Sequence, residues 1–448
     1  MSKNSDFTEG PILKQLIMFA VPILFALFLQ ALYGAVDLFV VGQFASSADV
    51  SGVSTGSQLT MMLANEITGF SMGLTVLIGR KIGEKKTDEV GRTIGAGIVL
   101  MALIGLGLSL VVFVFAPQIS GVLNAPTEAF AATSSYVRIC GAGMIVITGY
   151  NLIGAIFRGL GDSKTPLIVV AVACVFNILG DLLLVAVFGM GASGAAIATV
   201  GAQFISLIVS YVIIKRKERV FTISKGDIRF DADISKSIVS LGLPLAFSDA
   251  LIALSFLVVL AIVNSLGLVV SAGVGVAEKV CGFIMLFSAA FSQSMAAFVA
   301  QNMGAKKPDR AFRVLRCGIV LSLVCGVVLA WMSFFHGDIL TGIFSKDSQV
   351  VAAGWEYLKA CAIDCLLVSF MFCLIGFFNG MGMTKFTMIQ GIVGAFCVRI
   401  PFSYVMSKQV PVSLFAIGLA TPASSVLQIL LCAGCMIWLR KSGKYEFK

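Results

Sequence analysis

Residues 19–42 read FAVPILFALFLQALYGAVDLFVVG, a hydrophobic run that is long enough to cross a bilayer yet contains a proline, a glutamine and an aspartate. Gln30, Tyr33 and Asp37 are spaced three and four residues apart, so on a helix they lie on one face. An ionised carboxylate in hydrocarbon costs about 3 kcal/mol on insertion scales. Asp37 therefore needs a partner, a bound cation or a proton.

The composition of the whole chain resembles that of this stretch. Of its 448 residues, 58% are hydrophobic and 12% are charged, whereas a soluble domain usually has about 25% charged residues. Repeated apolar segments of about 20 residues predict a polytopic α-helical membrane protein. We expect no cleavable signal peptide, because the polar first ten residues precede an apolar run of full membrane length.

Twelve membrane spans can be placed on the apolar segments. Their approximate residue ranges are 15–39, 51–78, 92–115, 133–156, 166–187, 193–214, 237–263, 273–300, 314–335, 355–379, 386–406 and 413–439. Lys and Arg are concentrated in alternate loops, which the positive-inside rule assigns to the cytoplasm. We therefore expect a multi-pass protein of the cell inner (plasma) membrane with both termini cytoplasmic. The net charge of +9 then reflects topology, and no nucleic-acid partner is expected.

The two halves of the chain repeat each other. Residues 79–100, GRKIGEKKTDEVGRTIGAGIVL, align without gaps to residues 300–321, AQNMGAKKPDRAFRVLRCGIVL, at an offset of 221. Further pairs occur at an offset of 221 or 222: FRGLGDSK (157–164) with FNGMGMTK (378–385), Pro22 with Pro244, and Thr199 with Thr421. This similarity indicates internal duplication. Each copy has six spans, so the repeats are parallel and related by an axis along the membrane normal.

The duplication predicts the domain organisation. Residues 1–214 form an N-terminal lobe with spans 1–6, residues 215–236 a polar cytoplasmic linker, and residues 237–448 a C-terminal lobe with spans 7–12. The expected fold is an all-α membrane protein with 12 transmembrane helices in two pseudo-symmetric six-helix lobes. Two such lobes with a cavity between them predict an alternating-access transporter, in which one chain can act alone as a monomer.

Several motifs in order along the chain identify a family. They are the first span with its proline and aspartate, the GRKIG-type loop, FRGLGDSKTP, NILGD and GASGAAIAT. The combination covers essentially the whole sequence and is similar to that of the MATE (multidrug and toxic compound extrusion) transporters, which belong to the MOP flippase superfamily. The resemblance implies a twelve-helix, two-lobe antiporter that exports mostly organic cations in exchange for Na⁺ or H⁺.

The resemblance also implies a cation site in the N-terminal lobe. In the subgroup with an acidic residue in the first span, this site is formed by an aspartate of span 1, an Asn and Asp of span 5 and a threonine of span 6. The matching positions here are Asp37, Asn177, Asp181 and Thr199. The resemblance further suggests that Pro22 lets span 1 bend, although it can equally be an ordinary membrane proline.

The residue types at these positions support the same site. Asn177 and Asp181 are four residues apart and face one side of a helix. Two carboxylates, an amide oxygen and a hydroxyl can replace much of the hydration shell of Na⁺, or two nearby carboxylates can hold a proton. The alternative is that these groups only bond neighbouring helices, which applies most to Thr199. No cofactor beyond the coupling ion is expected.

Other polar residues inside the spans are candidates for lining a substrate cavity. The C-terminal lobe has no acid at the position of Asp37, which corresponds to Val258 or Val259, so the two lobes are expected to do different work. The cavity candidates are Gln30, Tyr33, Glu66, Asp249 and Glu278, with Asp364 a weaker one. The alternative is that the acids reach water near span ends or pair with Arg399 or Arg138.

The sequence contains no motif for an enzyme or an ATP-driven pump. The single histidine, His336, lies near a span end, and Cys432 and Cys435 form a C-x-x-C inside an apolar helix without companion ligands. The eleven cysteines are interpreted as small hydrophobic residues. We therefore expect a transporter with a small, cationic, amphiphilic substrate that works in the lipid bilayer.

Two other functions remain open. A flippase on the same fold would move a lipid-linked or other amphiphilic metabolite, and its cavity would be lined with Arg or Lys to hold an anionic head group. A receptor or scaffold without transport activity is the second alternative. The excess of acidic residues inside the spans favours cationic cargo over the first, and a polar cluster in mid-membrane favours transport over the second.

Overall fold

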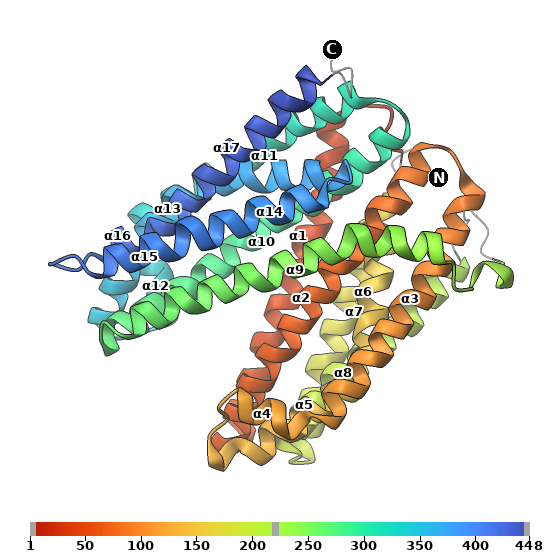
Figure 1. Cartoon of the computed structure of the whole chain (residues 1–448). Helices are drawn as coiled ribbons and strands as arrows, with labels where there is room; N and C mark the ends of the chain where they lie inside the picture. The colour runs from red at the N-terminus through yellow and green to blue at the C-terminus, as the bar shows by residue number, and fades with distance from the viewer. Residues whose placement is uncertain (1–5, 217–223, 443–448) are drawn as a thin grey trace. The chain divides into compact units, whose positions relative to one another are not determined.

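The computed structural model describes residues 6–216 and 224–442, and all regular structure within these ranges is helical (Figure 1). Eleven helices there are long and apolar enough to cross a membrane, and the number rises to 12 when one bent pair is counted as a single span. The predicted all-α membrane fold is thus confirmed. Part of the predicted linker, residues 217–223, lies outside the described residues.

The helices follow one another with short connections. In the first half of the chain they are α1 (Ile12–Phe44), α2 (Ser47–Gly83), α3 (Thr87–Val114), α4 (Ala116–Val122), η1 (Thr127–Ala129), α5 (Phe130–Ala142), α6 (Met144–Gly159), α7 (Lys164–Asp181), η2 (Leu182–Val187) and α8 (Gly191–Arg216). A short turn, η3 (Lys225–Asp227), precedes the second half. That half comprises α9 (Ala232–Asn264), α10 (Leu268–Gly304), α11 (Pro308–Phe335), α12 (Gly337–Gly342), α13 (Ser348–Gly380), α14 (Thr384–Val393), η4 (Gly394–Arg399), α15 (Ile400–Ser407), α16 (Leu414–Gly418) and α17 (Ala420–Lys441).

The helix lengths reproduce the internal duplication. Helices α1 and α9 both have 33 residues, α2 and α10 both have 37, and α3 and α11 both have 28. The turn after α2 and the turn after α10 each contain a lysine with positive φ, Lys85 at 58° and Lys306 at 56°. The backbone therefore repeats even at the strained positions of the two loops.

By their contacts the residues form two compact units. Of the described residues, unit 1 comprises Asp6, 21–216 and 224–246, and unit 2 comprises 7–20 and 247–442. Helices α1 and α9 thus each contribute to both units, which the repeat pattern did not anticipate. Each of the two helices continues through its internal proline, Pro22 or Pro244. Whether Pro22 bends α1 during function stays a prediction.

Each unit has its own apolar core. In unit 1, buried side chains of α2, α3 and α6 pack together with Ile238 of α9. In unit 2, the core joins α9, α10, α13 and α16 around Val263 and Leu358, both of which are fully buried. Many apolar side chains on the outer faces of the helices are exposed, as expected for surfaces that contact lipid.

The span predicted at residues 133–156 is not one straight helix. It consists of Thr127–Ala142 and Met144–Gly159, which meet at Gly143 with a bend of 53°. A side chain at Gly143 would collide with Val200 of α8, so the glycine lets the break lie directly against that helix. A glycine inside an apolar pattern is a known site of helix kinks, but the pattern alone did not predict this one.

The start of α8 is held in place by the start of α2. Ser46 and Asp49 form a capping box at the first turn of α2, with Ser46 Oγ accepting from the Asp49 N–H at 3.2 Å. Oδ1 of the Asp49 carboxylate accepts a hydrogen bond from the N–H of Ala192, in the first turn of α8, at 3.0 Å. Gly191 has φ +51°, and a Cβ there would collide with the Asp49 carboxylate. Asp49 therefore caps two helices, one of which carries Thr199.

Candidate functional site

Three helices of unit 1 bring the four predicted cation-site residues together. Asp37 comes from α1, Asn177 and Asp181 from the end of α7, and Thr199 from α8. Thr199 Oγ1 donates to Oδ2 of Asp37 at 3.1 Å and accepts from Nδ2 of Asn177 at 3.4 Å. The carboxyl groups of Asp37 and Asp181 also lie within interaction range of each other. We call these four residues the N-site.

The N-site is closed to water and rich in oxygen atoms that lack a partner. The exposed fractions are 3% for Asp37, 1% for Asn177, 0% for Asp181 and 6% for Thr199. Asp37 Oδ1, Asn177 Oδ1 and both carboxylate oxygens of Asp181 have no hydrogen-bonding partner among the described residues. Buried polar atoms are nearly always paired in proteins. A cation or a proton bound among these four oxygens would provide the partner that they lack.

Close packing of α7 against α8 sets the geometry of the N-site. A Cβ at Gly180 would lie 2.9 Å from the Cβ of Ala198, so small residues let the two backbones approach. This approach places Thr199 opposite Asn177. Immediately after Asp181 the helix continues as the π-helical turn η2, and such turns are frequent at functional sites.

The oxygen donors of the N-site suit a hard monovalent cation. The site has two carboxylates, one amide oxygen and one hydroxyl. Within residues 6–216 and 224–442 no group of three or more His, Cys, Asp or Glu side chains is placed to hold a metal ion. The arrangement thus differs from a transition-metal site, and neutral oxygens complete it. Its role in binding a cation stays a prediction.

Tyrosines and glutamines of unit 1 surround the N-site. Gln30 Nε2 donates to the Tyr150 hydroxyl at 3.5 Å, and Tyr33, one turn before Asp37, interacts with Gln203 of α8. Tyr136 of α5, which is 1% exposed, interacts with Thr199. Tyr136 and Gln203 were not predicted from the sequence. The one available signal was the repeat, because Tyr136 matches Tyr357 at an offset of 221.

The remaining predicted cavity residues lie elsewhere. Glu66 is half-buried on α2, and Asp249 is exposed on α9. Glu278 lies on α10 in unit 2 and lines a cavity of about 190 Å³. Neither Glu66 nor Asp249 lines that cavity. His336 ends α11 with its ring 4.8 Å from that of Trp331.

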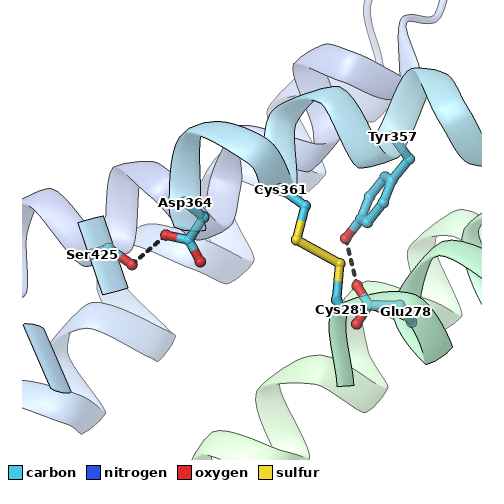
Figure 2. Close-up of a disulfide and its surroundings, with 6 residues drawn as sticks. All are labelled: Glu278, Cys281, Tyr357, Cys361, Asp364 and Ser425. Carbon is cyan, nitrogen blue, oxygen red and sulfur yellow. Dashed lines mark hydrogen bonds between the residues drawn. A yellow bond between two sulfur atoms is a disulfide. The ribbon is translucent and has the colours of Figure 1, made fainter. Parts of the chain in front are cut away.

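The cavity of unit 2 is lined by two carboxylates, those of Glu278 and Asp364 (Figure 2). We call this cavity and its lining residues the C-pocket. Tyr357 donates its hydroxyl proton to Glu278 Oε1 at 2.7 Å, and Ser425 donates to Asp364 Oδ1 at 2.7 Å. Asp364 is 1% exposed, and its Oδ2 has no hydrogen-bonding partner among the described residues. Asp364 was only a weak candidate from the sequence, yet the structure places it beside Glu278.

Two cysteines of the C-pocket correct the interpretation of all cysteines as small hydrophobic residues. Cys281 of α10 and Cys361 of α13 form a disulfide, which Figure 2 shows between Glu278 and Asp364. The other nine cysteines, with Cys432 and Cys435 among them, are free. The pair is 80 residues apart in sequence, so no local motif could have revealed it.

A buried arginine accompanies the C-pocket. Arg399, at the end of η4, is 5% exposed. Its Nη1 donates to Ser255 Oγ at 2.9 Å, and its guanidinium lies 4.2 Å from the ring centre of Phe256, which lines the pocket. The guanidinium also interacts electrostatically with both pocket acids. Pairing of an intramembrane acid with Arg399 was one of the two alternatives from the sequence.

Comparison with known proteins gives consistent matches over the whole chain. The sequence model of one family, described as MatE, matches residues 22–183 and 244–405. The Probable multidrug resistance protein YpnP of Bacillus subtilis (strain 168) is 27% identical over 406 residues, which cover 90% of this chain and 91% of that protein. The Probable multidrug resistance protein NorM of Thermotoga maritima is 26% identical over 448 residues, which cover 97% of this chain and 93% of that protein.

Solved structures share the fold. A crystal structure of a MATE protein in complex with MaL6 superposes with a TM-score of 0.90 at 16% identity, covering 99% of this chain and 98% of that one. The two family matches begin at Pro22 and Pro244. They coincide with the two halves of the internal duplication.

Proposed function

The chain belongs to the MATE family of multidrug efflux transporters, and we propose that it exports organic cations in exchange for Na⁺ or H⁺ by alternating access. The observation that carries the proposal is the N-site, with four buried oxygen atoms that have no hydrogen-bonding partner within residues 6–216 and 224–442. A bound cation or proton would offset the repulsion between Asp37 and Asp181. Loss of that ion when the unit rearranges would complete one transport cycle.

Each residue of the N-site has a role that its hydrogen bonds suggest. Asn177 donates its amide N–H to Thr199, which leaves its Oδ1 available to a cation. Thr199 donates to one oxygen of Asp37, which leaves the other oxygen available. Asp181 contributes two further oxygens, for which the described residues provide no hydrogen-bonding partner. The chain thus supplies oxygen ligands from three helices, whose relative movement would release the ion.

The surroundings complete the proposal. Gln30 and Tyr33 continue the polar face of α1 next to Asp37 and would contact substrate, as would Glu66, Asp249 and Glu278. We further propose a monomeric transporter, rather than an enzyme, in the inner membrane, with cytoplasmic termini and no cofactor beyond the coupling ion. The relatives are named as multidrug resistance proteins, which supports a small-molecule substrate; we propose that it is cationic and amphiphilic because the intramembrane charges are mainly acidic.

Thermal unfolding of the purified protein tests the site. The melting temperature is measured against Na⁺ concentration, with choline as the balancing ion, at two pH values. Stabilisation that follows RT ln(1 + [Na⁺]/Kd) and disappears in Asp37→Asn assigns Na⁺ to the N-site. Glu66→Gln is the matched control, since it removes an intramembrane carboxylate outside the N-site. A protein that ignores Na⁺ but is stabilised by acid in an Asp37-dependent way would be proton-coupled.

Transport by energised vesicles tests the activity itself. Efflux of ethidium or a fluoroquinolone is expected, and Asp37→Asn should abolish it. The alternative, a flippase of a lipid-linked or other amphiphilic metabolite, predicts no movement of these cations and translocation of a lipid-linked precursor instead. A protein that moves neither class would point to a receptor or scaffold.

A further inference from the structure

The duplication relates the N-site to the C-pocket position by position. The offset between the halves is 221 at FRGLGDSK and 222 at Thr199 and Thr421. The corresponding helix of each half contains a π-helical turn, η2 at residues 182–187 and η4 at residues 394–399. With the offset of 222 that pairs Thr199 with Thr421, Asn177 corresponds to Arg399. Thr421 lines the C-pocket.

The second copy of the site has exchanged its charges. At the same offset Asp37 corresponds to Val259 and Asp181 to Ser403, so both N-site carboxylates are missing. Arg399, with its guanidinium group, is the residue that corresponds to Asn177. The C-pocket acids come from other positions, because Glu278 and Asp364 correspond at an offset of 221 to Ser57 and Gly143.

Arg399 lies against Phe256, a residue that lines the C-pocket, and within electrostatic range of both acids. Its hydrogen bond to Ser255 and its contact with the ring of Phe256 fix the planar head group, and such stacking favours arginine over lysine. Its charge acts on Glu278 and on Asp364. Without it, the buried carboxylate of Asp364 and the partly buried one of Glu278 would face one cavity with only hydroxyl donors for support. Uncompensated buried charges strongly destabilise a protein.

We propose that Arg399 is the tethered counter-ion of the C-pocket, so that the chain binds a free coupling cation only in unit 1. The side chain supplies the positive charge that a dissociable cation supplies in the N-site, and the inference in this respect rests on the proposed function. Removal of its charge turns the C-pocket into a second site for a monovalent cation. The cavity of about 190 Å³ has room for Na⁺ with several waters, each of which occupies about 30 Å³, or for methylammonium.

The unpartnered atoms of the pocket support this assignment. Asp364 Oδ2 and Arg399 Nε are both buried and both lack a hydrogen-bonding partner among the described residues. Asp364 Oδ2 could therefore act as a ligand for a cation. The guanidinium of Arg399 offsets the negative charge of this carboxylate but makes no hydrogen bond to its Oδ2. A small cation could therefore reach Asp364 once the positive charge is gone.

The test compares Asp37→Asn with Asp37→Asn/Arg399→Gln in the full-length protein. Thermal unfolding is followed against NaCl and against methylammonium chloride, with choline chloride as the balancing salt. The melting temperature of Asp37→Asn is expected to be independent of the concentration of either cation. The double variant is expected to regain a cation-dependent rise in melting temperature of roughly 2–4 °C at saturation. Adding Asp364→Asn should remove that rise again, and Asp37→Asn/Arg399→Lys should behave like Asp37→Asn.

Two results would overturn the proposal. One is a double variant that folds but responds to neither cation, and the other is a response that survives Asp364→Asn. If Arg399→Gln does not fold, Arg399→Gln/Asp364→Asn decides, because removal of an acid should rescue a protein that lost its counter-ion. No rescue would assign Arg399 a packing role and refute the proposal. Failure of the proposed function would give a different result. In that case the rise in melting temperature with cation concentration would be the same in Asp37→Asn as in the wild-type protein.

Discussion

The hydroxyl of Thr199 donates a hydrogen bond of 3.1 Å to Oδ2 of Asp37, 162 positions earlier in the chain. Both residues are more than nine-tenths buried. The bond joins α1 to α8, and the second oxygen of Asp37 has no partner among the residues that the structure describes. The N-site is therefore assembled by tertiary contacts but is not saturated by them, which is what a releasable ion requires.

The variant Thr199→Val should weaken both the fold and ion binding. It keeps the volume of the side chain but leaves a buried carboxylate oxygen without its donor, at a cost of about 1–3 kcal/mol. The melting temperature should fall, and the Na⁺ concentration needed for half-maximal stabilisation should rise. Thr148→Val is the matched control, because Thr148 is 1% exposed and its hydroxyl has no partner among the described residues. Equal losses in the two variants would contradict the role of Thr199.

Neutralising Asp181 should stabilise the ion-free protein. In the N-site both oxygens of Asp181 lack a partner in the described part of the chain, and this carboxyl group lies within interaction range of the Asp37 carboxyl. Asp181→Asn therefore removes repulsion between like charges. We expect a higher melting temperature than wild type in Na⁺-free buffer at alkaline pH, together with a smaller gain on adding Na⁺. A variant with the wild-type Na⁺ response would show that the cation binds elsewhere.

The junction between α2 and α8 should tolerate no side chain at position 191. Gly191→Ala forces a left-handed conformation on alanine, which costs about 1–2 kcal/mol, and also pushes its Cβ into the Asp49 carboxylate. The free energy of unfolding should fall by at least that amount. Gly201→Ala on the same helix is the control: a Cβ there meets no atom within 4 Å, so the change should be neutral or stabilising. Denaturant or thermal unfolding in detergent measures both.

The N-terminal segment of unit 2 should depend on Phe7. Its ring is 1% exposed and stacks on Phe298 with a centroid distance of 3.6 Å. Gln301 accepts from its N–H at 3.2 Å, and Arg310 Nε donates to its carbonyl oxygen at 2.9 Å. Phe7→Ala should cost about 3 kcal/mol and make the segment before α1 sensitive to protease. Phe7→Leu should retain most of the stability. Protease resistance unchanged in Phe7→Ala would show that the backbone bonds alone suffice.

Much of the candidate site could be predicted from the sequence. Asp37 was conspicuous because a carboxylate within an apolar run is costly, and the resemblance to a family supplied Asn177, Asp181 and Thr199 as partners. The structure brings all four together. Tyr136 and Gln203 were missed because buried tyrosines and glutamines are ordinary in membrane helices, and only the rotation of α5 and α8 turns these two toward the N-site.

The sequence by itself determined the helical membrane fold, the duplication and the positions of the intramembrane charges. These follow from apolar length, repeat offset and composition, which are local or periodic properties. Only the tertiary structure decided that α5 and α6 break at Gly143, that Cys281 meets Cys361, and that Arg399 stands beside Glu278 and Asp364. Such contacts depend on how each helix is rotated and how closely it packs, and spacing along the chain does not encode either.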